Sequence, residues 1–365
     1  MPIFDQGYQH WQGRLRGHAW RWLAITRQGV RQQGRRRWTK WLITSAFAPA
    51  LALAGFLVFW GLFEQKSTLL QPFMALIQGL PEEVRNGPKV YRSAVWTYAF
   101  EVFFSFSTFF SMLLVLAVGP DLVSQDLRFN AFPLYLSRPL RRVDYFAGKL
   151  GVIAVFLGAV TIGPAVAAYV LGLAFSFDLG VLKDTWRLLV GSAGYGLIVV
   201  LSAGTLMLAI SSLSKNSRLV GAAWVVLWVV SNVSASVLQE TVRKDWCPLV
   251  SYTSNLDRLR AEMLDTESAR KKFLELYLAG REAGRDAVRP RVLFGGNRRR
   301  RGPAPPPPPD FDEHGRPNEA FIPPPLQAPE NMKHPWTWSA GVLGGLLLAS
   351  AWTLSTRVKS LDRLK

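Results

Sequence analysis

The chain has 365 residues, a formal net charge of +18 and many large aromatic residues, including 14 Trp and 22 Phe. Its apolar residues gather in blocks of about 20, the length at which a helix crosses the hydrocarbon core of a bilayer. This pattern excludes a soluble globular protein, and the lone Cys247 excludes an intrachain disulfide.

Residues 1–40 are strongly basic, with nine Lys and Arg and a single acidic residue, Asp5. Apolar residues recur there at helical spacing, and Trp residues are interleaved with them. Trp is enriched at the headgroup level of membranes. We therefore expect a basic amphipathic helix lying on the membrane surface over 1–40, rather than a solvated basic tail.

Six apolar stretches follow, and they predict an all-α polytopic membrane protein with six transmembrane helices. The expected spans are 41–63, 95–118, 150–175, 188–213, 219–238 and 336–354. Pro164, directly after Gly163, predicts a kink in the third span. Gly341 and Gly345 in the sixth span are typical of close helix packing.

The distribution of basic residues predicts the orientation of these spans, because cytoplasmic segments carry an excess of Lys and Arg. With both termini in the cytoplasm, the inner segments hold 20 Lys and Arg and the short outer connectors hold 6. The inner segments are 1–40, 119–149, 214–218 and 357–365, and the outer connectors are 64–94 and 176–187. We therefore expect both termini to be cytoplasmic.

The segment 239–335 is expected outside in this topology, although it carries 17 Lys and Arg, because long loops translocate largely regardless of charge. If one of the six spans is wrong, it lies inside. Its first part, 255–288, has the pattern of one or two amphipathic helices. From residue 290 it is rich in Arg, Gly and Pro, which predicts a disordered or polyproline II spacer, with a partner-binding site as the alternative.

The connector 119–149 is the best candidate for a functional segment. Pro120 and Asp121 suit the first turn of a helix, where Asp complements the helix dipole. Apolar residues such as Leu127 and Leu134 would give that helix an apolar face that needs a partner. Composition alone favours a basic loop lying against the membrane, with its arginines paired with lipid phosphates or with a docked protein.

Within this connector, residues 134–150 read LYLSRPLRRVDYFAGKL. The segment resembles the connector between spans two and three in permease subunits of type-2 ABC exporters, and ISSLSKNSR at 210–218 is weakly similar to the same family. The basic N-terminal helix, six spans and cytoplasmic termini also match that layout. The long segment 239–335 departs from it, because the family usually has a shorter region there.

The resemblance implies that 119–149 forms a coupling helix that contacts a separate ATP-binding subunit, and that ATP and Mg²⁺ are bound by that subunit. It also implies a second permease subunit, identical or related, and a location in the bacterial cytoplasmic membrane. The residues expected to contact the ATPase are Asp121, Asp126, Leu127, Leu134, Arg138, Pro139, Arg141, Arg142 and Asp144. Because membrane orientation explains the basic charge, we expect no nucleic-acid partner.

Four polar residues inside the predicted spans are candidates for a substrate pathway or a dimer face. They are Glu101, Ser105, Thr108 and Asn232. An ionisable residue in a span is costly and usually faces protein or water. A carboxylate reaching the outer interface is the alternative for Glu101, and a hydrogen bond to a neighbouring helix is the alternative for Asn232.

No phosphate-binding loop and no hydrolase or metalloprotease motif occurs, so we expect neither a catalytic residue nor a metal or cofactor in this chain. The expected function is the transmembrane permease subunit of an exporter whose substrate the sequence does not reveal. A membrane scaffold that binds a partner through the outer loop is the alternative. A lipid-modifying membrane enzyme built around Glu101 is a third possibility.

Overall fold

The computed structural model describes residues 20–131, 141–176, 178, 180–288 and 334–361, and every regular element in this part of the chain is helical. Six helical segments are long and apolar enough to cross a membrane. They are Arg37–Glu64, Pro88–Arg128, Arg142–Ser176, Gly180–Leu213, Ser217–Val242 and Trp336–Arg357. Each contains one of the six predicted spans, so the prediction of an all-α protein with six apolar helices is confirmed.

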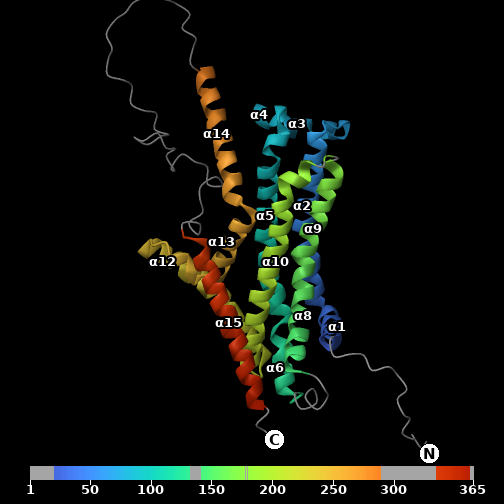
Figure 1. Cartoon of the computed structure of the whole chain (residues 1–365), viewed down its shortest axis with the longest axis vertical. Helices are drawn as coiled ribbons and strands as arrows, with labels where there is room; N and C mark the ends of the chain where they lie inside the picture. Colours follow the sequence, from blue (N-terminus) through green and yellow to red (C-terminus); the bar gives the residue numbers. More distant parts are fainter. Residues whose placement is uncertain (1–19, 132–140, 177, 179, 289–333, 362–365) are drawn as a thin grey trace, which may run out of the picture.

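The helices form an elongated bundle (Figure 1). In chain order they are α1 (Arg21–Gly34), α2 (Arg37–Glu64), η2 (Thr68–Phe73), α3 (Met74–Gln78), α4 (Glu82–Asn86), α5 (Pro88–Val118), α6 (Pro120–Arg128), α8 (Arg142–Val160), α9 (Ile162–Ser176), α10 (Gly180–Leu213), α11 (Ser217–Val225), η3 (Val226–Val230), α12 (Ser231–Val242), η4 (Cys247–Val250), α13 (Tyr252–Leu264), α14 (Thr266–Val288) and α15 (Trp336–Leu361). We call the end with α6 and the last turns of α15 the α6 end, and the opposite end, with α3 and α4, the α4 end (Figure 1).

The third span is two helices, because α8 ends and α9 begins around Thr161. Pro164 has no backbone N–H, so it cannot bond the carbonyl of Val160 four residues earlier. That carbonyl instead accepts a hydrogen bond of 2.8 Å from the Ser107 hydroxyl of α5. The break therefore lies where the sequence predicts a kink, and a neighbouring helix satisfies the freed backbone group.

The fifth span contains a π-helical turn, η3, between α11 and α12. Before this turn, Trp224 is fully buried and donates a hydrogen bond of 3.2 Å to the Met112 carbonyl of α5. After it, α12 leans away from the bundle (Figure 1). Val229, Val233 and Val237 are then about half exposed, so this span presents an apolar surface to lipid or protein.

At the α4 end of the bundle, a buried ion pair, Arg92–Glu64, is joined by two carboxylates that are more exposed. The Arg92 guanidinium donates to both Glu64 carboxylate oxygens, through Nε at 2.9 and 3.0 Å, and also reaches Asp178 and Asp184, each at 3.2 Å. The Gly180 N–H, then Arg92 and then Lys89 lower the pKa of Asp178 to about 2. One guanidinium thus joins α2, α5 and α10 at this end.

The described part of the predicted N-terminal helix is α1, which packs against α8. Thr26 donates a hydrogen bond of 3.0 Å to the Gly148 carbonyl, and a Cβ on Gly148 would lie 2.7 Å from Ile25. Large apolar side chains of this segment are exposed, namely Trp20 before α1, Leu23 in α1 and Trp38 at the start of α2. The described part of 1–40 is therefore not one helix, because α1 ends at Gly34 and α2 begins at Arg37.

In the long segment 239–335, the structure has two helices in sequence, α13 and α14, joined at Asp265 in a left-handed conformation. Arg258 of α13 donates a hydrogen bond of 2.9 Å to the His334 carbonyl, which links α13 to the start of α15. The Pro-rich part, 289–333, lies outside the described residues. The connector 64–94 contains three short helices, η2, α3 and α4.

Candidate functional site

The first candidate site is the junction around α6, a nine-residue helix that begins at Pro120 directly after α5. Pro120 occupies the first turn, and Asp121 lies there as the sequence predicts. Leu122, Val123 and Ser124 are buried. The apolar face of α6 therefore packs against the protein's own bundle.

Both carboxylates of α6 form ion pairs within the chain. Asp121 pairs with Arg36, which lies between α1 and α2, at 2.5 Å. Asp126 pairs with Lys149 of α8 at 2.7 Å and accepts a hydrogen bond of 2.6 Å from the Tyr145 hydroxyl. The four charged side chains are at most 38% exposed, so these pairs are partly shielded from water. They fix α6 to two neighbouring helices.

Serine residues join α6 to the end of α10 and the start of α11. The Ser211 hydroxyl donates to the Pro120 carbonyl at 2.9 Å and accepts from the Ser124 N–H at 3.0 Å. Ser124 also shares a hydrogen bond of 2.8 Å with Ser217. The first-turn N–H groups of α6, which lack partners in their own helix, are thus partly satisfied by α10. Ser211 and Ser217 were not predicted as site residues, although both lie in the ISSLSKNSR segment.

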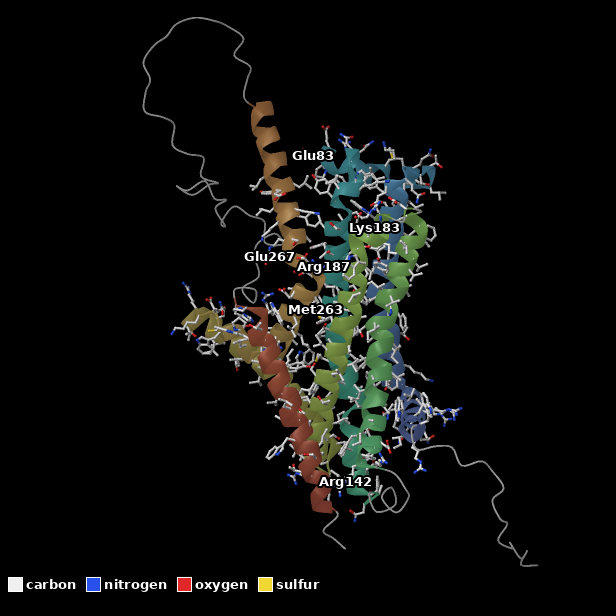
Figure 2. The ribbon with its side chains drawn as sticks, viewed as in Figure 1. Glu83, Arg142, Lys183, Arg187, Met263 and Glu267 are labelled. Carbon is white, nitrogen blue, oxygen red and sulfur yellow. The ribbon has the colours of Figure 1, made fainter. Side chains whose placement is uncertain are left out.

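The remaining residues predicted for ATPase contact lie on either side of this junction. Leu127 is partly buried against the core. The Arg141 N–H donates a hydrogen bond of 3.2 Å to the Asp144 carboxylate at the start of α8, and Arg142 lies at the α6 end (Figure 2). Leu134, Arg138 and Pro139 lie outside the described residues.

The second candidate site is a group of charged and polar side chains between α5, α10 and α13, which we call the Arg260 cluster. Arg260 is 7% exposed and pairs with Asp257, one turn earlier in α13, at 2.8 Å. The charge of Glu101 on α5 and the hydroxyl of Tyr195 on α10 also act on Arg260. Thr108 of α5 shares a hydrogen bond of 2.7 Å with Tyr195. The cluster is therefore Glu101, Thr108, Tyr195, Asp257 and Arg260.

The polar groups of the Arg260 cluster are not all satisfied by hydrogen bonds among the described residues. The Nε atom of Arg260 is buried and has no hydrogen-bond partner among the described residues. Burial raises the pKa of Asp257, while the Arg260 charge opposes that rise. A buried guanidinium and two partly buried carboxylates thus lie together, and charged groups in such settings mark functional sites in membrane proteins.

The four polar residues predicted for a pathway or dimer face do not share one environment. Glu101 and Thr108 belong to the Arg260 cluster, whereas Ser105 is exposed and donates only to the Glu101 carbonyl of its own helix, at 3.0 Å. Asn232 donates to the Trp228 carbonyl at 2.7 Å and accepts from Ser251 at 2.7 Å. Asn232 therefore holds the turn between α12 and α13, as expected from its alternative role in helix packing.

Comparison of the chain with protein families, with curated proteins and with solved structures found no match. Within the described residues, no three or more His, Cys, Asp or Glu side chains come together as metal ligands. The α6 junction and the Arg260 cluster are therefore the two candidate functional sites in the described part of the chain.

Proposed function

We propose that this chain is the transmembrane permease subunit of a bacterial ABC exporter of the type-2 class, with the α6 end in the cytoplasm. The observation that carries the proposal is the α6 junction. A nine-residue helix beside the basic connector contacts α1 and α2 through Arg36, α8 through Lys149, and α10 and α11 through Ser211 and Ser217. A helix with these contacts is suited to transmit movement of a docked subunit to the transmembrane helices.

In the proposed mechanism, a separate ATP-binding subunit docks on the connector 119–149 and binds ATP and Mg²⁺. Closure of that subunit displaces the connector, and α6 moves with it. Hydrogen bonds that involve charged groups contribute about 1.5–3 kcal/mol each, and neutral ones about 0.5–1.5 kcal/mol. Through the Asp121, Asp126 and Ser211 contacts, movement of α6 would be coupled to α8 and α10. The spans then alternate between inward-open and outward-open states.

The proposed transport pathway runs past the Arg260 cluster, at the surface where α5 faces a second permease subunit. Glu101 and Asp257 are only partly buried in the single chain. A carboxylate left facing lipid is costly, so a second subunit or a water-filled pathway must cover this side. The exposed Ser105 lies on the same helix. This position supports a polar route between two subunits, and the class of substrate stays open.

The docking part of the proposal is tested by reversing charge on the connector. The triple variant Arg138→Glu, Arg141→Glu and Arg142→Glu is expected to lose the ATPase during affinity purification in mild detergent, while the chain stays folded. The matched control reverses three exposed cations on the same side of the bundle, Arg31, Arg35 and Lys40. The control should retain the ATPase. Equal retention in both variants would overturn docking at the connector.

The transmission part is tested separately with Ser211→Ala, which removes the bonds from α10 to α6 without changing the connector. The ATPase should still co-purify with this variant. Its ATP hydrolysis should respond less to the conformation of the permease, for example to a disulfide trap between spans. Hydrolysis that stays fully responsive in Ser211→Ala would exclude the α6–α10 contact as a transmitting element.

A further inference from the structure

A cavity of about 740 Å³ lies at the α6 end, between α6 and the turn that joins α10 to α11. Seven of its eight lining residues are of polar or charged types, and three of these are basic. The residues that line it are Asp121, Gln125, Arg128, Phe129, Lys215, Asn216, Ser217 and Arg218. The walls are held in place by the Ser124–Ser217 hydrogen bond of 2.8 Å and by the Ser211 contacts described above. The cavity is thus framed by elements that are joined to one another by hydrogen bonds.

The charge of the cavity is uncompensated. Arg128, Lys215 and Arg218 are exposed, and none of them forms an ion pair among the described residues. The one acidic residue in the lining, Asp121, already pairs with Arg36 at 2.5 Å. The adjacent segment 132–140 has no acidic residue in its sequence, so it supplies no counter-charge. Three cations around one cavity, without an ion pair among the described residues, create a positive potential that favours an anionic ligand.

The surroundings of the cavity fit a lipid better than a free solute. Leu213 is 52% exposed and Leu219 is 61% exposed, and these two residues flank the basic turn 214–218 on its α10 and α11 sides. Phe129, 71% exposed, lies in the cavity wall beneath the Arg128 guanidinium, 5.6 Å from its ring centroid. Apolar side chains around a basic cavity at the end of membrane spans match the boundary between acyl chains and phosphate headgroups.

We propose that this cavity binds the phosphate headgroup of an anionic membrane lipid in the leaflet at the α6 end, with Arg128, Lys215 and Arg218 as the phosphate ligands. Basic pockets between spans are a general mode of anionic lipid recognition. The N-terminus of α11, which begins at Ser217, adds a favourable helix dipole. A lipid seated there contacts α6 and α11 together and stabilises the junction between them. This inference goes beyond the proposed function, and its test needs no ATPase.

The experiment titrates the purified full-length chain in nonionic detergent with short-chain phosphatidylglycerol, short-chain phosphatidylcholine or inorganic phosphate, and records the thermal unfolding midpoint. Phosphatidylglycerol should raise the midpoint of the wild-type protein in a saturable manner, and phosphatidylcholine should not. In the triple variant Arg128→Gln, Lys215→Gln and Arg218→Gln, the affinity for phosphatidylglycerol should fall about tenfold or more, because each basic residue near a phosphate contributes on the order of 1 kcal/mol.

The matched control removes the same number of charges at the same end, outside the cavity, with Arg31→Gln, Arg35→Gln and Lys40→Gln. This variant should keep the wild-type affinity. An equal loss of affinity in both triple variants would show general charge attraction and overturn the site. An effect of inorganic phosphate equal to that of the lipid would assign the cavity to a free anion and overturn the lipid assignment. If the cavity variant does not fold, the single Lys215→Gln variant gives the same comparison.

Discussion

The Arg92 guanidinium of α5 and the Glu64 carboxylate of α2 form a buried ion pair in which both side chains are 2% exposed. The carboxylate also accepts a hydrogen bond of 2.7 Å from the Trp60 indole. Such a pair is costly to break, because a lone buried charge has no water to solvate it. It fixes the α4 end of the bundle, so that motion transmitted from α6 would leave this end closed until the pair separates.

Replacing Arg92 with Met should destabilise the protein strongly. The change leaves Glu64 buried without a counter-charge, and removal of one partner from a buried pair costs about 3–5 kcal/mol. We expect the thermal unfolding midpoint in detergent to fall by on the order of 10 °C. Adding Glu64→Gln to Arg92→Met should recover part of the loss. The control is Arg85→Met, since Arg85 and Glu82 form an exposed pair at 3.3 Å. A similar fall in the control would contradict the role of the buried pair.

A methyl group at Gly151 should loosen α1 from α8. The added Cβ would collide with the Thr26 hydroxyl and lie 3.1 Å from its Cγ2 atom, and overpacking of this kind costs about 1–3 kcal/mol. Gly151→Ala should therefore speed tryptic cleavage at Arg27 and Arg31 of α1. Gly158→Ala is the matched control in the same helix, because nothing lies within 4 Å of its Cβ position. If both variants are cleaved at the wild-type rate, the contact does not hold α1.

Stability should fall in mildly acidic solution because of His334. Burial, and then the nearby Arg258 charge, lower the pKa of His334, while Asp245 opposes this shift. The unfolded chain then takes up a proton that the folded chain does not, so stability is highest above the unfolded pKa of about 6.5 and declines as the pH falls below it. His334→Gln should flatten the dependence of the unfolding midpoint between pH 7 and 5. An unchanged dependence would exclude His334 as its cause.

The interaction between Glu101 and Arg260 should be measurable in a double-mutant cycle. Glu101→Gln, Arg260→Gln and the double variant are compared by their thermal unfolding, and we expect a coupling energy of about 0.5–3 kcal/mol, as is usual for residues of one charge network. Pairing Ser105→Ala with Arg260→Gln is the control, because Ser105 bonds only its own helix. Additive effects of Glu101 and Arg260 would remove Glu101 from the cluster.

The spans were predictable from the sequence because each is a local feature: an apolar block of sufficient length shows itself without its neighbours. The break near Pro164 was predictable for the same reason, since a proline changes its own helix. The hydrogen bond from Ser107 that satisfies the freed Val160 carbonyl was not, because it joins residues 53 positions apart. The same limit applies to the pairs of Asp121 and Asp126 with distant basic residues.

The site was predicted only in part, and the reason lies in α13. Asp257 and Arg260 lie among other charged residues in the sequence, which predicts that they are on the solvent-exposed face of an amphipathic helix. In the structure Arg260 is buried with Leu256 and Leu259, because α13 packs between other helices rather than on the surface. The signal in the sequence was an acidic and a basic residue one turn apart, Asp257 and Arg260, each next to a leucine. That signal is common on exposed helices as well.

The most direct measurement is affinity purification of the tagged chain from its native membrane in mild detergent, followed by identification of the proteins that accompany it. We expect a stoichiometric partner with a phosphate-binding loop, and ATP hydrolysis by the complex that requires Mg²⁺. An intact, folded chain that repeatedly purifies without such a partner would contradict the assignment as an exporter permease.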